Sequence, residues 1–378
     1  MGPLAGLKII EIAGIGPGPY AAMLLSDLGA DVVRIDRPNA GSMNPEKDVL
    51  NRGRPSIAVD LKNLDGIETV LQLVERADAL IEGFRPGVME RLGLGPDVCA
   101  ERNPRLVYGR MTGWGQEGPL SQTAGHDINY IAVAGVLHNF TRVGDRPMPP
   151  LNLVGDFGGG SMFLVMGVLA ALLHAQRTGE GQVVDAAMVD GAASLMTMEW
   201  AFRAMGIWDT ESPGTNLLDT GAPFYEVYEC ADGRWLSVGA IEAQFYAEFI
   251  KGLGLADDPD LPHQMDRSRW GETKQRFADL FRSKTRDEWW AVFEGTDACV
   301  APVLSPVEAL AQPHLVARGT FTDEWGIDQP APAPRFSRTP GALRRPASAP
   351  GADTDGALAS WGLSPGEIAK LREAGAIG

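Results

Sequence analysis

What this 378-residue sequence has little of already narrows its class. It has 3 cysteines, widely spaced and odd in number (Cys99, Cys230 and Cys299), which predicts neither a disulfide framework nor a zinc site. It has 33 Lys and Arg against 49 Asp and Glu, a net charge of −16, which disfavours nucleic acid or an acidic membrane as a partner. The longest apolar run, residues 162–173, is short for a membrane span, and the N-terminus does not resemble a signal peptide. We therefore expect a cytoplasmic protein without a metal.

The first half of the chain alternates between two kinds of segment. Short apolar, β-branched runs predict strands, and the segments between them favour helices, one of which opens at Pro86. Parallel strands joined by right-handed crossovers follow from this order, so the predicted fold class is a doubly wound α/β sheet. The predicted strands are residues 7–12, 30–36, 56–61, 79–83 and 106–112, and the predicted helices between them include 20–28 and 65–76.

The second half predicts a change of architecture. An apolar helix over residues 162–175, a strand over 182–187 and a helix over 189–206 complete a large domain, residues 1–206. A Gly-, Pro- and Asn-rich linker follows at 207–223, and a hairpin around Ala231-Asp232-Gly233 opens a smaller α+β domain, residues 224–303. Residues 304–378 form the remaining segment. Its proline-rich part, 330–350, should be extended, and Ser364 should cap a short terminal helix.

A glycine-rich loop follows the first predicted strand. Gly14 and Gly16 match the first half of the dinucleotide-binding pattern G-x-G-x-x-G, and Asp36 lies near the place of a ribose-binding acid. However, Pro17 and Pro19 lack the N–H groups that such a loop offers to a pyrophosphate. We therefore interpret the loop as a tight turn close to a ligand or a neighbouring chain.

Cations follow three of the predicted strands. Arg37, Lys62 and Arg85 come after the second, third and fourth strands, and Arg91 comes six residues after Arg85. Ligands of open α/β sheets bind beyond the carboxyl ends of the strands, so a phosphorylated ligand would meet these cations. Exposed loops are also rich in Lys and Arg, and the residues alone leave both interpretations open.

Two residues are candidates for acid/base chemistry. Among the five histidines, at 126, 138, 174, 263 and 314, His126 stands out because it lies in a loop after a predicted parallel strand. Asp156 precedes three glycines and the apolar helix. It is either an N-cap of that helix or a carboxylate close to a ligand, and burial would then raise its pKa.

Several longer motifs occur in order along the chain. They resemble the class III coenzyme A (CoA) transferase family and, within it, the racemases that act on 2-methylacyl-CoA thioesters. The motifs are residues 4–11, 27–36, 82–87, 112–115 and 334–339, together with Gly-His-Asp-Ile-Asn-Tyr at 125–130 and Leu-Val-Gly-Asp-Phe-Gly-Gly-Gly at 153–160.

This resemblance implies a fold and a set of site residues. It implies an interlocked homodimer in which each chain has a Rossmann-like large domain and a small domain, with residues 304–378 returning to the large one. His126 and Asp156 would be the catalytic bases, and Glu242 would orient the histidine across the dimer interface; by itself Glu242 resembles an exposed acid in the first turn of a helix. CoA would be part of the substrate, with no separate cofactor. The residues implied in CoA binding are Arg37, Val59, Asp60, Leu61, Lys62, Gly83, Phe84, Arg85, Arg91, Gly125, Asp127 and Tyr130.

The expected reaction interconverts (R)- and (S)-2-methylacyl-CoA. Inversion removes a proton from one face of the α-carbon and returns one to the other, which requires two acid/base groups, and backbone N–H groups near Asp156 or Asp127 would stabilise the enolate oxygen. The main alternative is CoA transfer through an acyl-aspartyl anhydride on Asp156, which leaves His126 without a role. A non-catalytic acyl-CoA-binding protein is the third possibility.

Overall fold

The computed structural model describes residues 1–41 and 44–378. The chain forms two compact units. Unit 1 consists of Met1–Ala134, Pro150–Met196 and Ala317–Gly378, and unit 2 consists of Gly135–Pro149 and Thr197–Val316. These bounds differ from the expected ones, since residues 135–149, 197–206 and 304–316 group with the second unit instead of the first unit or the return segment.

Unit 1 is built on a six-stranded sheet whose strands are all parallel. Its order, β3-β2-β1-β4-β5-β6, is that of a Rossmann fold and confirms the predicted doubly wound class. The chain reverses its direction of winding between β1 and β4, so the loops that follow these two strands lead to opposite sides of the sheet. The strands are β1 Lys8–Ile12, β2 Asp31–Asp36, β3 Ser56–Ala58, β4 Ala79–Glu82, β5 Val107–Thr112 and β6 Val183–Ala187.

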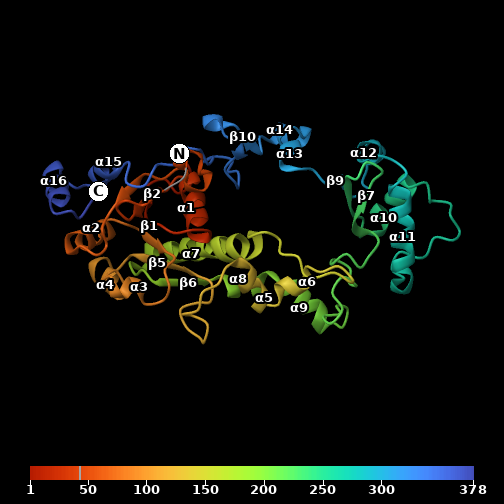
Figure 1. Ribbon diagram of the computed structural model, residues 1–378, viewed down its shortest axis with the longest axis horizontal. Helices are drawn as coiled ribbons and strands as arrows, with labels where there is room; N and C mark the ends of the chain where they lie inside the picture. The colour runs from red at the N-terminus through yellow and green to blue at the C-terminus, as the bar shows by residue number, and fades with distance from the viewer. Residues whose placement is uncertain (42–43) are drawn as a thin grey trace. The chain divides into compact units, whose positions relative to one another are not determined.

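Different helices cover the two faces of this sheet. One core joins the strands to α2, α15 and α16, and its largest fully buried side chain is Trp361. The other core joins the opposite face to α1 and α7. The helices of unit 1 are α1 Pro17–Asp27, α2 Leu64–Val74, α3 Val88–Arg91, α4 Pro96–Arg102, α5 Asp127–Val133, α7 Met162–Thr178, α8 Met188–Leu195, α15 Thr354–Ser360 and α16 Pro365–Glu373 (Figure 1).

The apolar helix is longer than the sequence predicts. A π-helical segment, Leu153–Ser161, runs directly into α7, so one helix extends over Leu153–Thr178. By length and composition this helix could cross a membrane, which corrects the expectation that the run is too short. In the structure its side chains Leu164, Val168 and Leu172 are buried in the core on the sheet.

The last segment of the chain, Ala317–Gly378, belongs to unit 1 and is held there by hydrogen bonds. Of the tract predicted to be extended, residues 331–350 contain no helix or strand, whereas Pro330 ends the short strand β11 Gln329–Pro330, which pairs with β10 Phe321–Thr322. Ser364 forms the predicted capping box. Asp353 accepts a hydrogen bond from the Ser56 N–H, and the carbonyl of Ala376 accepts one from Asp60. In Figure 1 the blue helices α15 and α16 accordingly lie beside the first strands and α2.

Unit 2 contains the predicted hairpin and an aromatic core. Strands β7 Tyr225–Glu229, β8 Trp235–Gly239 and β9 Val300–Pro302 form an antiparallel sheet. The rings of Tyr228, Phe249, Phe277 and Phe281 pack against one another on it. The helices of this unit are α6 Val136–Asn139, α9 Thr197–Ala204, α10 Ala243–Gly252, α11 Trp270–Phe281, α12 Arg286–Phe293 and α13 Pro306–Leu310; α14 Pro313–Arg318 lies at its end.

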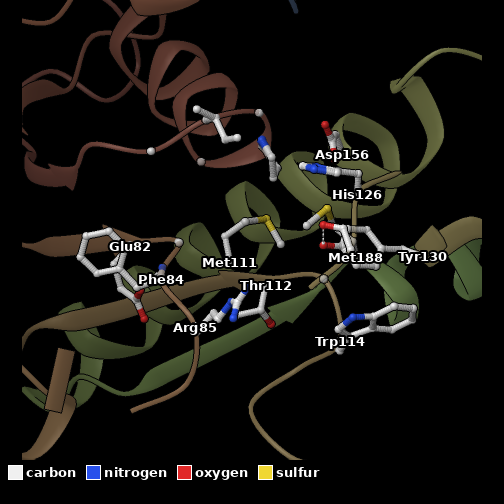
Figure 2. A pocket seen from close by; sticks show the side chains of 18 of the residues that line it. Glu82, Phe84, Arg85, Met111, Thr112, Trp114, His126, Tyr130, Asp156 and Met188 are labelled. Carbon is white, nitrogen blue, oxygen red and sulfur yellow. Dashed lines mark hydrogen bonds between the residues drawn. The ribbon is translucent and has the colours of Figure 1, made fainter. Parts of the chain in front are cut away.

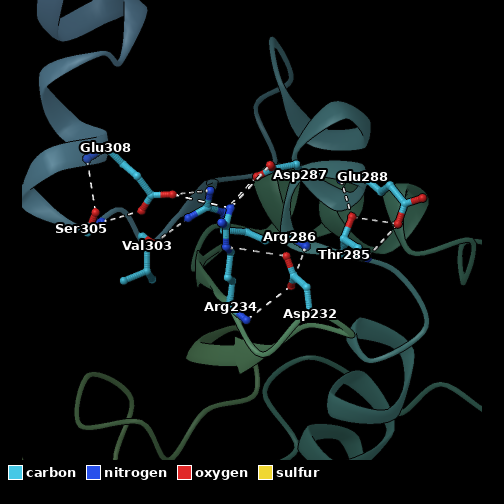
Figure 3. Close-up of polar contacts among 9 residues, drawn as sticks. All are labelled: Asp232, Arg234, Thr285, Arg286, Asp287, Glu288, Val303, Ser305 and Glu308. Atoms are coloured by element: carbon cyan, nitrogen blue, oxygen red, sulfur yellow. Dashed lines mark hydrogen bonds and ion pairs between the residues drawn. The ribbon is translucent and has the colours of Figure 1, made fainter.

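Polar contacts explain why unit 2 extends beyond its expected bounds. Arg142 donates to the buried carboxylate of Glu226 on β7, at 2.6 Å, which draws residues 135–149 to this unit. At the other end, buried Arg286 on α12 binds Glu308 of α13 at 2.8 Å and the carbonyl of Val303 (Figure 3). Because these contacts join segments far apart in sequence, local patterns do not predict them.

Candidate active site

A cavity of about 690 Å³ opens at the carboxyl ends of β1, β4 and β5. This is the point at which the strand order reverses, where ligands of open α/β sheets bind. The glycine-rich turn after β1 forms one side of the cavity, and the loop after β4 forms another. His126 and Asp156 both line it, with Tyr130, Met111 and Met188 nearby (Figure 2).

His126 lies where the long loop after β5 enters α5. It occupies the N-cap position of that helix, and its backbone N–H donates to Asn129 Oδ1 at 3.1 Å. This contact fixes the backbone at the start of the helix. The imidazole itself is exposed, so it can meet a ligand in the cavity.

Asp156 lies inside the π-helical segment and not at the N-terminus of α7, so it is not an N-cap of that helix. Its backbone N–H donates to Asp127 Oδ2 at 2.7 Å, and its own Oδ2 accepts from Asn152 Nδ2 at 3.1 Å. The glycines after it serve the packing of the protein: a Cβ at Gly159 would lie 2.5 Å from the backbone of Ala192 on α8. π-Helical turns of this kind are frequent at functional sites.

The surroundings of Asp156 shift its pKa in opposite directions. Burial raises its pKa above the usual value, and the negative charge of Asp127 adds to that effect. The amide of Asn152 and the charge of His126 lower the pKa. His126 and Asp156 are therefore coupled electrostatically, and Figure 2 shows the imidazole and the carboxyl group next to each other.

Tyr130 and Trp114 form one wall of the cavity. Their rings meet edge to face with centroids 4.8 Å apart, and the Tyr130 hydroxyl donates to the carbonyl of Gly125. This hydrogen bond ties the residue before His126 to α5. Burial raises the pKa of Tyr130, so its hydroxyl stays a donor at neutral pH.

The loop after β4 carries Gly83, Phe84 and Arg85 into the cavity lining. It is anchored from below by Glu82, whose Oε2 accepts from the Phe84 N–H at 2.7 Å and whose Oε1 accepts from Arg110 Nε at 3.0 Å. Arg110 also binds Glu90 of α3 at 2.8 Å. One buried guanidinium thus holds both ends of the loop.

Seven of the expected CoA contacts do not line this cavity, whereas Gly125 and Tyr130 do. The seven are Arg37, Val59, Asp60, Leu61, Lys62, Arg91 and Asp127. Arg37, Lys62 and Arg91 are exposed, and none of them forms an ion pair with any residue that the structure describes. The N–H groups of Val59 and Asp60 are already used, since they donate to the carbonyls of Asp36 and Ala376. At Val59 and Asp60 a ligand could therefore meet only carbonyl oxygens and side chains.

The expected site residue Glu242 lies outside the cavity. Glu242 belongs to unit 2, where it is exposed at the N-cap of α10, and it is not among the residues that line the cavity. Three residues that shape the cavity were not predicted from the sequence, namely Asn152, Glu82 and Arg110.

The contact between Asn152 and Asp156 could have been predicted from their spacing, because residues four positions apart lie side by side on a helix. Within residues 1–41 and 44–378, no group of three or more His, Cys, Asp or Glu side chains could hold a metal ion.

Comparison with known proteins identifies the family. The model of CoA-transferase family III matches residues 4–354, and the chain belongs to this family. Among curated relatives, it is 46% identical over 372 residues to the alpha-methylacyl-CoA racemase of Mus musculus and 45% identical over 371 residues to that of Homo sapiens. Each alignment covers 97% of this chain and 96% of the relative.

The solved structures support the fold. A CAIB/BAIF family protein from Brucella suis matches with a TM-score of 0.82 over 95% of this chain and 99% of that chain. At 24% identity this match shows a shared fold.

Proposed function

We propose that this protein is a racemase that interconverts (R)- and (S)-2-methylacyl-CoA thioesters. The observation that carries the proposal is the presence of His126 and Asp156 in one cavity, in a chain 45–46% identical to alpha-methylacyl-CoA racemases over nearly its full length. An imidazole and a carboxyl group are the two side chains best suited to exchange a proton near neutral pH, provided that burial raises the pKa of the carboxyl group, as it does for Asp156.

The reaction moves one proton across the α-carbon. One base removes the α-proton, and the electron pair of the C–H bond passes through the α-carbon to the thioester oxygen to form an enolate. The conjugate acid of the other base then returns a proton to the opposite face. The pair begins and ends with one shared proton, which lies on His126 for one enantiomer and on Asp156 for the other.

The enolate oxygen needs a hydrogen-bond donor. The N–H of Asp156 cannot serve, because it already donates to Asp127 Oδ2. The N–H of Asp127, in the first turn of α5, donates to no acceptor among the described residues. We assign the stabilisation of the enolate to this group.

CoA recognition would rest on the loop after β4 and on the unpaired cations Arg37, Lys62 and Arg91. The reaction as written is a proton transfer, so we propose that it needs no cofactor apart from the CoA of the substrate. We also propose the interlocked homodimer, in which Glu242 of the second chain would orient His126. The cytoplasmic location stays a proposal.

CoA transfer through an anhydride on Asp156 is the competing function, since it is the reaction for which the family is named. It would use the same carboxylate as a nucleophile and would give His126 nothing to do. The coupling of His126 and Asp156 in one cavity therefore favours proton transfer.

Isotope exchange tests the proposal. In D₂O the wild type should introduce deuterium at the α-carbon of both enantiomers of a 2-methylacyl-CoA. His126→Ala should lose exchange from the enantiomer whose α-proton faces the imidazole, with a loss of about 10²–10⁴-fold, and should keep exchange from the other.

His174→Ala is the matched control, because His174 is an exposed histidine on α7 outside the cavity. Exchange from both enantiomers that is unchanged in His126→Ala would refute the two-base assignment. A hydroxylamine-trapped acyl group on Asp156, or CoA passed to a free carboxylate, would establish the transferase reaction instead.

A further inference from the structure

One oxygen of the Asp156 carboxyl group is held from two sides. Asn152 Nδ2 donates to Oδ2 at 3.1 Å. From α1, Gly16 approaches the same atom so closely that a Cβ there would lie 3.1 Å from Oδ2. The other oxygen, Oδ1, accepts no hydrogen bond from the residues that the structure describes.

The packing of α1 fixes Gly16 against Asp156. Ser161 Oγ donates to the carbonyl of Pro17 at 2.7 Å, and the rings of Tyr20 and Phe157 lie 4.4 Å apart. Gly16 is the N-cap of α1 and has φ 68°, a conformation that L side chains rarely adopt. An alanine at this position would be strained in its backbone and would also push against the carboxyl group.

The backbone before Asn152 also adopts an uncommon conformation. Leu151 has φ 56°, and its side chain is 77% exposed, so no burial of its own side chain favours this conformation. The turn brings the chain from Pro150 into the π-helical segment with Asn152 four residues before Asp156. Strain of this kind persists where the surrounding structure holds it, and it gathers at functional sites.

Building on the racemase function proposed above, we propose that Asn152 and Gly16 are positioning residues that hold Oδ2 of Asp156 and leave Oδ1 to take and return the α-proton. The amide suits this role because it can donate in both halves of the cycle. When Asp156 is ionised, Oδ2 is a carboxylate oxygen, and when the proton is on Oδ1, Oδ2 is a carbonyl oxygen that still accepts.

The hydrogen bond from Asn152 to Asp156 also influences whether the shared proton lies on His126 or on Asp156. Burial and Asp127 raise the pKa of Asp156, whereas Asn152 and His126 lower it. Tyr130 of α5 is the other titratable group coupled to Asp156, and the first turn of α1 carries no acidic side chain. Without the amide, the pKa of Asp156 should rise. The doubly protonated and inactive pair would then form at a higher pH.

The pH dependence of kcat/KM in Asn152→Leu tests this inference, since leucine has nearly the shape of asparagine but cannot donate. We expect kcat/KM to fall about tenfold or more, and the acid limb of its pH profile to move up by about one unit, because the lost hydrogen bond is to a charged group. KM should change little, since the Asn152 amide donates to Asp156 and Asn152 is not one of the expected CoA contacts. Asn139→Leu is the matched control. Among the described residues the amide of Asn139, on α6, donates to the carbonyl of Gly135 and to no other acceptor.

A second pair of variants keeps the test decisive if Asn152→Leu fails to fold. Asn152→Asp is closest in shape and places a second negative charge beside Oδ2, so its acid limb should move up as well. Gly16→Ala should lower kcat while the protein stays folded by circular dichroism.

Folded Asn152 variants with the wild-type acid limb and wild-type kcat/KM would overturn the inference while leaving the racemase function intact. By contrast, a wild type that exchanges no α-proton would overturn the proposed function itself.

Discussion

Arg110, the buried arginine that binds both ends of the loop after β4, allows the contribution of this loop to stability and substrate binding to be tested. Arg110 joins two carboxylates, and its own side chain is 7% exposed, with Glu82 at 0%. Arg102 on α4 also joins two carboxylates, Glu68 and Glu75, but its side chain is 31% exposed and those of its partners are 46% and 44% exposed. The two arginines therefore form a matched pair that differs mainly in burial.

Replacing each arginine by methionine should have very different effects. Arg110→Met leaves Glu82 buried without its cation, which typically lowers the free energy of unfolding by about 3–5 kcal/mol. Arg102→Met breaks an exposed pair and should cost about 0–1 kcal/mol. Urea denaturation followed by circular dichroism measures both values.

The stability loss in Arg110→Met should depend on pH. Burial already raises the pKa of Glu82, and the loss of Arg110 should raise it further. When the pKa of a carboxyl group is higher in the folded state than in the unfolded state, its contribution to protein stability is complete at pH values below the unfolded-state pKa. This contribution is lost as the pH rises through the folded-state pKa. The gap between Arg110→Met and wild type should thus be wider at pH 7 than at pH 4.

The same variant should weaken the binding of substrate. Without Arg110, the loop that carries Phe84 and Arg85 loses the contact between its two ends, so KM for an acyl-CoA should rise more than kcat falls. Adding Glu82→Gln should restore part of the stability, because it removes the uncompensated charge. Equal stability losses in Arg110→Met and Arg102→Met, or no gain from the second substitution, would refute this account.

Two further predictions concern titrating groups. Because burial raises the pKa of Asp156, its stability contribution is complete below about pH 4 and is lost as the pH rises through its folded pKa. Asp156→Asn should therefore lose racemisation yet melt at a higher temperature than wild type at pH 7, and matching melting temperatures there would contradict the role of burial. In unit 2, the Arg286 guanidinium lowers the pKa of Glu308 to about 2. In Arg286→Met an NMR titration should show the Glu308 midpoint moving up towards its usual value of 4.5, and a midpoint still near 2 would show that the Ser305 contacts suffice.

The amino-acid sequence by itself determined the parts that depend on local order. The alternation of apolar β-branched runs with helical segments sets the order of elements in unit 1, and parallel pairing then places every strand-end loop at one edge of the sheet. The position of His126 and Arg85 in the cavity lining could be predicted for this reason, since each follows a strand. The capping box at Ser364 is equally local.

Only the tertiary structure decided how the side chains meet. Gly16 and Asp156 lie far apart in the chain, and their contact exists because α1 packs on the π-helical segment. The junction of Glu82, Arg110 and Glu90 depends on the neighbouring positions of β4, β5 and α3. A local pattern specifies which face of an element is apolar, but the distance between two elements depends on how their side chains pack together, which involves the whole chain.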